Sequence, residues 1–266
     1  MLQKIALISF ILCCFACKNG KNSVKTGKSY YPSGKIKQVY KYLNSCDTCL
    51  FDTFYSYYEN GKFESKIVYD SSGNETGTAK FYYPNGILKG TINYIKDIAQ
   101  GEQIRYDSLG NLNSKGFNFN GINVGDEYFY KNNKVWTYQF FDFHRNLFTS
   151  VEYDENGNIT KQEGDRGFLD SIKVEPIQNG FNLFKIFILQ PNPPRTSNKL
   201  IANYYDKQGK IIDFDSLNTT GIPLIHFQKK FKSNFSKLTL IDTQYDSILK
   251  KSFTWIYNNN MEYAPK

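Results

Sequence analysis

The sequence predicts an all-β protein: an extended, twisted antiparallel meander of β-hairpin repeats followed by a small, immunoglobulin-like β-sandwich. Three observations predict this class. A tyrosine followed by a polar turn and a glycine recurs about every 24 residues through the first two thirds of the chain. Aromatic residues make up 17% of the 266 residues, with 21 Tyr and 22 Phe, and such side chains favour strands. No apolar stripe of helical period follows the N-terminal segment.

Residues 1–16 resemble a bacterial lipoprotein signal peptide. One lysine precedes the apolar stretch 5–16, which is too short to span a bilayer and has the length of a signal-peptide hydrophobic region. The stretch ends in Ala and Cys17, and polar residues follow. A small residue before a cysteine resembles the lipobox, although Cys14 stands where leucine is usual. We therefore expect lipid attachment at Cys17; an ordinary signal peptide cleaved nearby is the alternative.

This signal-peptide resemblance implies an exported protein that is anchored in a membrane by its lipid. We expect the outer membrane, with the periplasmic or the surface face left open. Several acyl chains on one cysteine anchor firmly, because each buried CH₂ contributes about 0.8 kcal/mol. Residues 17–28 are polar and are predicted to be a tether.

Cys46 and Cys49 are the cysteines that remain after the signal segment, in the spacing Cys-Asp-Thr-Cys. An exported protein meets an oxidising compartment, so a local disulfide that staples a loop is one interpretation. Free thiols and thioredoxin-type redox chemistry are the alternatives, but the flanking residues resemble strands, and redox cysteines usually begin a helix. Neither histidine has a ligand spacing to this pair, so no metal site is predicted.

Residues 29–164 form the predicted repeat domain. A leading tyrosine opens each copy, at Tyr30, Tyr57, Tyr82, Tyr106, Tyr130 and Tyr153. Five copies have a turn glycine four residues later, at Gly34, Gly61, Gly86, Gly110 and Gly157, whereas the copy at Tyr130 has Asn133, three residues after its tyrosine, in place of the glycine. An apolar residue stands two positions after each turn residue, and a second glycine series follows the same beat at Gly77, Gly101 and Gly125.

Each copy is predicted to be a hairpin. Asn-Gly between aromatic segments is turn chemistry, because glycine, and next best asparagine, accepts a positive φ. Around Asn85 as the midpoint, Tyr82 and Leu88 would face each other across the hairpin and pack as a cross-strand pair. Weaker turn signals fall between the glycine turns, so the chain is expected to reverse about every 12 residues. The sheet would have eleven or twelve strands and a tyrosine ladder along one face.

The unit at Gly77–Leu88, Gly-x-x-x-x-Tyr-Tyr-Pro-Asn-Gly-x-Leu, resembles the MORN repeat variant that occurs in bacterial lipoproteins and in antitoxin or immunity proteins. The resemblance covers about residues 29–163. It implies a binding or scaffolding surface for a protein or lipid, and it supplies no catalytic residues. Copies with Tyr-Asp-x-x-Gly-Asn, such as Tyr106–Asn111, also resemble the YD repeats of Rhs-type shells, which need many more copies to enclose a volume.

Residues 165–266 are predicted to form the β-sandwich. The 24-residue repeat ends after Gly164, and seven short candidate strands follow, separated by turn signals. The candidate strands are 168–175, 181–190, 198–205, 210–215, 222–232, 236–242 and 247–257. The immunoglobulin Cys–Trp–Cys signature is absent, so this prediction depends on strand count alone.

No catalytic motif appears, so we expect neither enzyme activity nor a cofactor. The formal charge of +8 is modest for the length and gives no argument for nucleic acid as a partner. One hypothesis is a lipid-anchored, cell-envelope binding or scaffold protein that presents its tyrosine ladder to a protein or glycan. Tyrosine suits recognition, although the ladder also serves simply to hold the sheet together. The alternative is an immunity or antitoxin protein that neutralises a partner toxin by direct binding, an inference from family analogy only.

Overall fold

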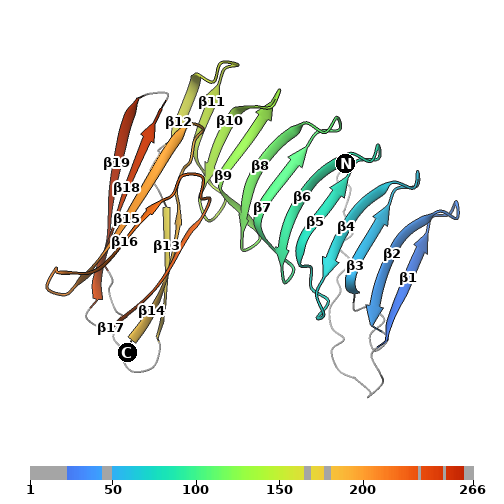
Figure 1. Ribbon diagram of the computed structural model, residues 1–266, viewed down its shortest axis with the longest axis horizontal. Helices are drawn as coiled ribbons and strands as arrows, with labels where there is room; N and C mark the ends of the chain where they lie inside the picture. Colours follow the sequence, from blue (N-terminus) through green and yellow to red (C-terminus); the bar gives the residue numbers. More distant parts are fainter. Residues whose placement is uncertain are drawn as a thin grey trace, which may run out of the picture.

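The computed structural model describes residues 23–43, 50–164, 169–176, 181–232, 235–247 and 250–260. Within these ranges every regular element is a strand, which confirms the predicted all-β class. The first twelve strands form one antiparallel sheet in chain order, and Figure 1 shows them as a long row from blue to olive. Their bounds are β1 Val24–Tyr30, β2 Ile36–Leu43, β3 Leu50–Tyr57, β4 Phe63–Tyr69, β5 Gly77–Tyr82, β6 Leu88–Ile95, β7 Ile98–Tyr106, β8 Leu112–Phe119, β9 Ile122–Lys131, β10 Lys134–Phe141, β11 Leu147–Tyr153 and β12 Ile159–Gly164.

The hairpin turns along one edge of this sheet share a geometry. In the first turn the N–H of Gly34 donates to the carbonyl of Tyr31 at 2.9 Å, and the N–H of Tyr31 donates to the carbonyl of Lys35 at 2.8 Å. This is a type I turn closed by a glycine in the left-handed region, and it shifts the strand register beside Tyr30. The predicted turn glycines all have a positive φ, namely Gly34 (81°), Gly61 (83°), Gly86 (87°), Gly110 (90°) and Gly157 (82°).

The copy without a turn glycine uses a shorter turn. Asn132 and Asn133 have φ values of 52° and 60°, and Lys131 pairs directly with Lys134. Two consecutive residues with positive φ make a type I′ turn, which asparagine tolerates. The hairpin thereby keeps its register without glycine. On the opposite edge of the sheet the same turn type joins neighbouring hairpins at Lys96-Asp97 and Asn120-Gly121.

Several turns have aspartate after the leading aromatic residue, and this aspartate closes the turn. The Oδ1 atom of Asp107 accepts hydrogen bonds from the N–H groups of Leu109 and Asn111, each at 2.9 Å. The side chain of Asn111 also donates to Asp107, and these hydrogen bonds hold the pKa of the carboxyl below its usual value. The two backbone hydrogen bonds to the aspartate recur at Asp70, Asp142, Asp154 and Asp206.

Tyrosine doublets join consecutive hairpins. The hydroxyl of Tyr58 donates to the carbonyl of Tyr82 at 2.8 Å, and the hydroxyl of Tyr83 donates to the carbonyl of Tyr106 at 2.9 Å. Tyr31 does the same to Tyr57 at 2.7 Å. The second tyrosine of one copy therefore bonds the leading tyrosine of the next copy. We call these hydrogen bonds the tyrosine rungs. Turn asparagines add a parallel series, in which Asn60 donates to Pro84 and Asn85 to Ser108.

The remaining strands form two smaller antiparallel sheets, of order β13-β14-β17 and β16-β15-β18-β19. The first, second and fifth strands share one sheet, and the third, fourth, sixth and seventh share the other, which is a Greek-key arrangement of the immunoglobulin type. Between the sheets lies a core of buried side chains that includes Phe184, Ile186, Tyr204, Phe235 and Leu240. The bounds are β13 Leu169–Pro176, β14 Phe181–Leu189, β15 Thr196–Asp206, β16 Ile211–Asn218, β17 Ile225–Lys232, β18 Phe235–Asp246 and β19 Lys251–Asn260.

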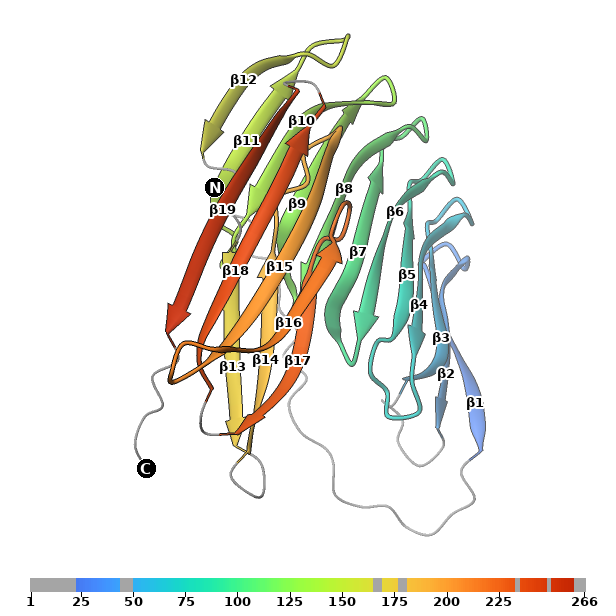
Figure 2. The same ribbon diagram turned by 60° about the vertical axis from the view of Figure 1, so that its left-hand side comes forward.

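This sandwich packs against the last hairpins of the repeat sheet, as the two views of the molecule show (Figures 1 and 2). Leu189 lies in one buried apolar cluster with Tyr138, Val151 and Tyr153 of the repeat sheet, and Leu224 packs against that cluster. The contact is therefore a hydrophobic core between the repeat sheet and the sandwich, which holds the two parts together.

A buried polar cluster completes the junction. The Nδ2 group of Asn192 donates to Oδ2 of Asp126 at 2.9 Å, and its N–H donates to Oδ1 at 2.9 Å. The hydroxyl of Tyr138 donates to the same Oδ1 at 2.6 Å, while Tyr128 donates to the carbonyl of Asn192 at 2.7 Å. These bonds satisfy a carboxyl that is almost completely buried, and they specify how the sandwich sits on the sheet.

The N-terminal boundary differs from the prediction. Residues 24–28 are predicted to belong to the tether, but β1 starts at Val24, five residues before the predicted repeat domain. This edge strand has polar side chains at Lys25, Thr26 and Lys28, so its sequence lacks the apolar alternation that predicts a strand. Paired backbone groups, rather than apolar burial, hold it against β2. The last strand of the repeat sheet ends at Gly164, and the predicted strands beyond it correspond to β13–β19 with shifts of a few residues.

The tyrosine rungs give a stability prediction. Tyr83→Phe removes the donor to the carbonyl of Tyr106 and is expected to lower the free energy of unfolding by about 0.5–1.5 kcal/mol. Tyr82→Phe is the matched control, because that hydroxyl donates to no partner in the described part of the chain, and a change below about 0.5 kcal/mol is expected. Urea denaturation measures both. Equal losses for the two variants would contradict a role for the rungs.

Two buried carboxyl groups, Asp126 at the junction and Asp242 in β18 of the sandwich, give a pH prediction. Burial raises the pKa of Asp242 to about 7 and that of Asp126 to about 6, from 3.8. Between about pH 4 and 7 the folded protein keeps protons that the unfolded chain releases. Stability therefore falls as pH rises through this window, by up to about 1.4 kcal/mol per pH unit for each group.

Asp242→Asn tests this effect in thermal unfolding experiments from pH 4 to 8. Gln190 donates to Oδ1 of Asp242, while Oδ2 has no partner among the described residues, so an amide fits without a buried charge. The variant is expected to match the parent near pH 4 and to be more stable at pH 8. An unchanged difference across the whole range would show that Asp242 does not titrate in this window.

Candidate functional site

One face of the repeat sheet has the tyrosine ladder. Each leading tyrosine pairs with the apolar residue two positions after the turn, and the predicted pairing of Tyr82 with Leu88 is confirmed. The pairs are Tyr30 with Ile36, Tyr57 with Phe63, Tyr82 with Leu88, Tyr106 with Leu112, Tyr130 with Val135, and Tyr153 with Ile159. The turns and bulges recur at the same place in each hairpin, so these side chains share one face, which we call the ladder face.

The ladder face is open at the β1 end and covered at the β12 end. The side chain of Tyr30 is 56% exposed and that of Phe63 is 42% exposed, whereas Tyr153 is only 8% exposed. The ring of Phe63 lies 5.0 Å from that of Tyr57 and 6.0 Å from that of Tyr82, so the aromatic contact continues from one hairpin to the next. The exposed end is therefore a continuous aromatic surface.

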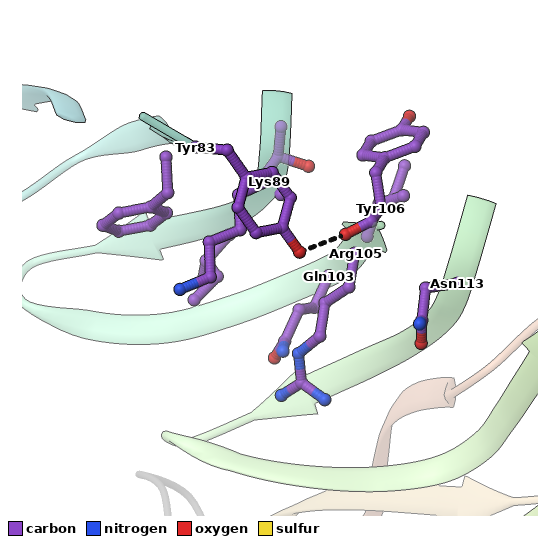
Figure 3. Close-up of a pocket in the computed structure, with 11 residues that line it drawn as sticks. Tyr83, Lys89, Gln103, Arg105, Tyr106 and Asn113 are labelled. Atoms are coloured by element: carbon purple, nitrogen blue, oxygen red, sulfur yellow. Dashed lines mark hydrogen bonds between the residues drawn. The ribbon is translucent and has the colours of Figure 1, made fainter. Parts of the chain in front are cut away.

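The opposite face carries a groove, and we call this side the groove face. The groove has a volume of about 420 Å³ and lies over β6, between Phe81, Tyr83 and Lys89 on one side and Arg105 and Asn113 on the other (Figure 3). Its floor is Gly90. A Cβ atom at this position would come within 2.5 Å of the carbonyl oxygen of Ile104, so glycine is required for the strands to pair here.

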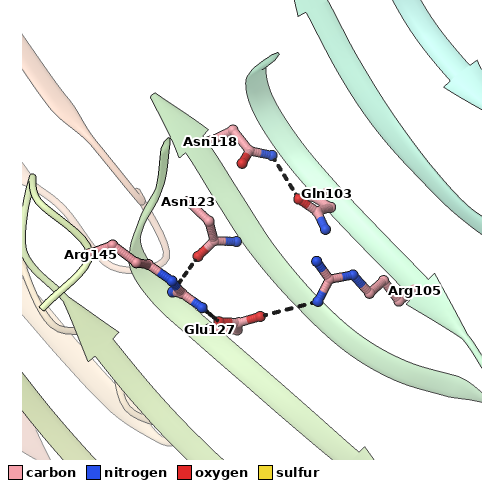
Figure 4. A network of polar contacts seen from close by, with 6 residues as sticks. All are labelled: Gln103, Arg105, Asn118, Asn123, Glu127 and Arg145. Atoms are coloured by element: carbon pink, nitrogen blue, oxygen red, sulfur yellow. Dashed lines mark hydrogen bonds and ion pairs between the residues drawn. The ribbon is translucent and has the colours of Figure 1, made fainter. Parts of the chain in front are cut away.

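A polar network borders the groove (Figure 4). Glu127 is 3% exposed and accepts a hydrogen bond from Arg145 at 2.6 Å, while Arg105 lies 3.8 Å away on its other side. Arg145 also donates to Asn123 at 2.7 Å. The amide of Gln103 lies within hydrogen-bond distance of the Arg105 guanidinium. The network therefore holds the guanidinium of Arg105 at the groove wall.

Arg145 occupies a strained backbone position to make these contacts. Its φ is 69°, in the region where the equivalent aspartate turns have glycine, as at Gly110. The guanidinium carbon lies 3.5 Å from the ring centroid of Phe141, a cation–π contact. The side chain of Arg145 reaches Glu127 from this position, a contact that glycine would not make.

The other predicted site residues have different outcomes. Cys17, Cys46 and Cys49 lie outside the described residues. Within the described ranges no three His, Cys, Asp or Glu side chains gather as metal ligands, and no helix is long and apolar enough to cross a membrane. The tyrosine rungs and the groove are structural features that the sequence analysis does not predict. The Tyr-Tyr doublets were the available signal for the rungs, because each doublet precedes a turn of the common type.

Family comparison agrees with the hairpin geometry. The family described as the MORN repeat variant matches residues 24–44 and 75–96, which contain the hairpins β1–β2 and β5–β6. No curated protein matches this chain. Such repeats point to a binding or scaffold role. The two matched hairpins, with their glycine turns on the same edge of the sheet, are therefore similar to the MORN repeat variant.

Proposed function

We propose that this protein is a non-catalytic, lipid-anchored binding and scaffold protein of the cell envelope, and that its ladder face from β1 to β7 holds a protein partner. One observation carries the proposal. The same face, in the same repeat register, already binds the sandwich of this chain at its far end, through Tyr128, Tyr138 and Tyr153. The remaining two thirds of the ladder face present equivalent positions without the sandwich above them (Figure 2).

Side chains beside the ladder indicate the chemistry of the partner. In the covered part, Tyr128 and Tyr138 pair across two strands and contact the sandwich. The equivalent pairs in the open part include Tyr55 with Lys66 and Lys80 with Thr91. Lysine thus replaces tyrosine next to the aromatic ladder. Such a surface suits a protein whose contact area has apolar and acidic side chains, since complementary charge steers association.

Tyrosine is well suited to such a surface. It supplies a large contact area with few rotatable bonds, so little side-chain entropy is lost when a partner binds. The rungs keep the backbones of neighbouring hairpins together, so the ladder is preorganised before the partner arrives. Support for the anchor comes from the Ala-Cys17 junction at the end of the apolar stretch, which would hold the sheet at a membrane surface.

The test is affinity capture of the tagged, lipidated protein from its own cells after cross-linking. Combined Tyr57, Tyr82 and Tyr106→Ala substitutions are expected to abolish capture of a specific partner by a protein that still folds, as judged by circular dichroism. Lys80→Glu, at an exposed position of the same face, is expected to weaken capture without touching the core. Cys17→Ser is expected to release the protein from the membrane fraction.

Matched controls are Lys89→Gln and Arg105→Gln, because both residues line the groove on the opposite face. They should leave capture intact. Capture that survives the folded tyrosine variant would refute binding by the ladder face. A captured toxin whose gene adjoins this one would select the immunity alternative, which uses the same surface.

A further inference from the structure

We propose that the groove over Gly90 is a second binding site, which takes an extended acidic segment of a protein. This site lies on the face opposite the ladder and does not depend on the proposed function of that face. The groove residues that carry the argument are Phe81, Lys89, Gly90, Ile92, Gln103 and Arg105.

Charge is the first argument. Two cationic side chains, Lys89 and Arg105, line the groove, and none of its described lining residues is acidic. The ammonium group of Lys89 lies 5.7 Å from the centre of the Tyr83 ring, so the aromatic face keeps the cation at the groove wall. Two cations around a cavity whose described lining holds no carboxylate favour an anionic ligand.

The arrangement of Arg105 is the second argument. Glu127, its acidic neighbour, makes its short contact to Arg145 at 2.6 Å and lies 3.8 Å from Arg105. Glu127 and Gln103 orient the guanidinium of Arg105. The side chain is still 56% exposed, so part of it remains accessible to a ligand. The guanidinium N–H groups that are not bonded to Gln103 remain available to the oxygens of a carboxylate. The neighbouring side chains thus hold a carboxylate receptor in position.

The repeat itself provides the third argument, because the groove departs from it. The residue four positions after each turn residue has a side chain in the other described hairpins, whereas β6 has Gly90 there. The equivalent residues are Gln38, Ser65, Ser114, Thr137 and Lys161. Arg105 pairs with Ser114 across its hairpin and is the cationic residue at this position of the repeat. The corresponding residues of the other described hairpins are Ser29, Ser56, Phe81, Phe129 and Glu152. An empty floor beside a preorganised arginine is therefore specific to this hairpin.

The walls indicate a peptide as the source of the carboxylate. Phe81 and Ile92 supply apolar surface beside the cations, and Asn113 supplies an amide group that both donates and accepts hydrogen bonds. Peptide groups need this combination, and an acidic residue next to an apolar one would use both kinds of wall. A volume of about 420 Å³ is large enough for a few residues of extended chain. The rung from Tyr83 to Tyr106 fixes the spacing between the walls.

The test starts from a display library of random heptapeptides selected on the full mature chain. Selected peptides are expected to contain Asp or Glu beside an apolar residue. Binding of a selected, fluorescein-labelled peptide is then measured by fluorescence anisotropy. The combined Lys89→Gln and Arg105→Gln substitutions are expected to weaken binding at least about tenfold, and Lys80→Gln, on the ladder face, is expected to leave it unchanged.

Replacing the carboxylate of the peptide by its amide should cause a similar loss with the parent protein and little further loss with the double variant. Glu127 keeps Arg145 in this variant, so the melting temperature should be close to that of the parent. If the double variant does not fold, Lys89→Gln alone serves, since Lys89 forms no ion pair within the described ranges.

Selected peptides without acidic residues, or equal affinity for parent and variant, would overturn the proposal. The tyrosine variants of the ladder face should still bind the peptide. Partner capture tests the ladder face, and peptide binding tests the groove. A variant that loses one and keeps the other therefore distinguishes the two proposals.

Discussion

The spacing from one hairpin to the next is the constraint on which the rest of the structure depends. Because side chains alternate across a strand, a slip of one residue would move every side chain to the other face. The turn and the adjacent bulge set the register within a hairpin, and the rungs link neighbouring hairpins over 26, 24 and 23 residues. The tyrosines remain on the ladder face although these separations differ.

This register gives one sheet two chemically different faces. The ladder face has a uniform aromatic row, part of which is covered by the sandwich through Tyr138 and Tyr153. The groove face varies from hairpin to hairpin, and its variation places Gly90, Arg105 and Glu127 near one another. A regular face suits a broad contact with a partner, whereas an irregular face allows one local site. The buried bonds between Asp126 and Asn192 keep the sandwich from covering the sheet in another orientation.

The regular features were predictable from sequence, and the irregular features were not. Periodic tyrosines and glycines predict the hairpins, and the spacing around Asn85 predicts the pairing of Tyr82 with Leu88. The start of β1 at Val24 escaped prediction because an edge strand held by backbone bonds needs no apolar pattern. The sandwich was predictable as a set of strands, but its contact with Tyr138 depends on side chains distant in sequence.

The groove and its network escaped prediction for a related reason. Gly90, Arg105, Glu127 and Arg145 come from different hairpins, and bulges decide which of their side chains share a face. Side chains alternate between the two faces along a strand, and each bulge interrupts this alternation. Sequence spacing alone therefore does not predict that these residues lie together. The position of Arg145 is a weak sequence signal of the network, because arginine stands there where equivalent turns have glycine.

The central claim is that the register creates a docking surface on the ladder face. Site-specific photo-crosslinking tests it directly, with a photoreactive amino acid placed singly at Lys80 on the ladder face or at Phe214, which is 65% exposed in the sandwich. The account predicts that the partner in native cells forms an adduct with the protein labelled at position 80. An adduct at position 214 with none at position 80 would contradict it.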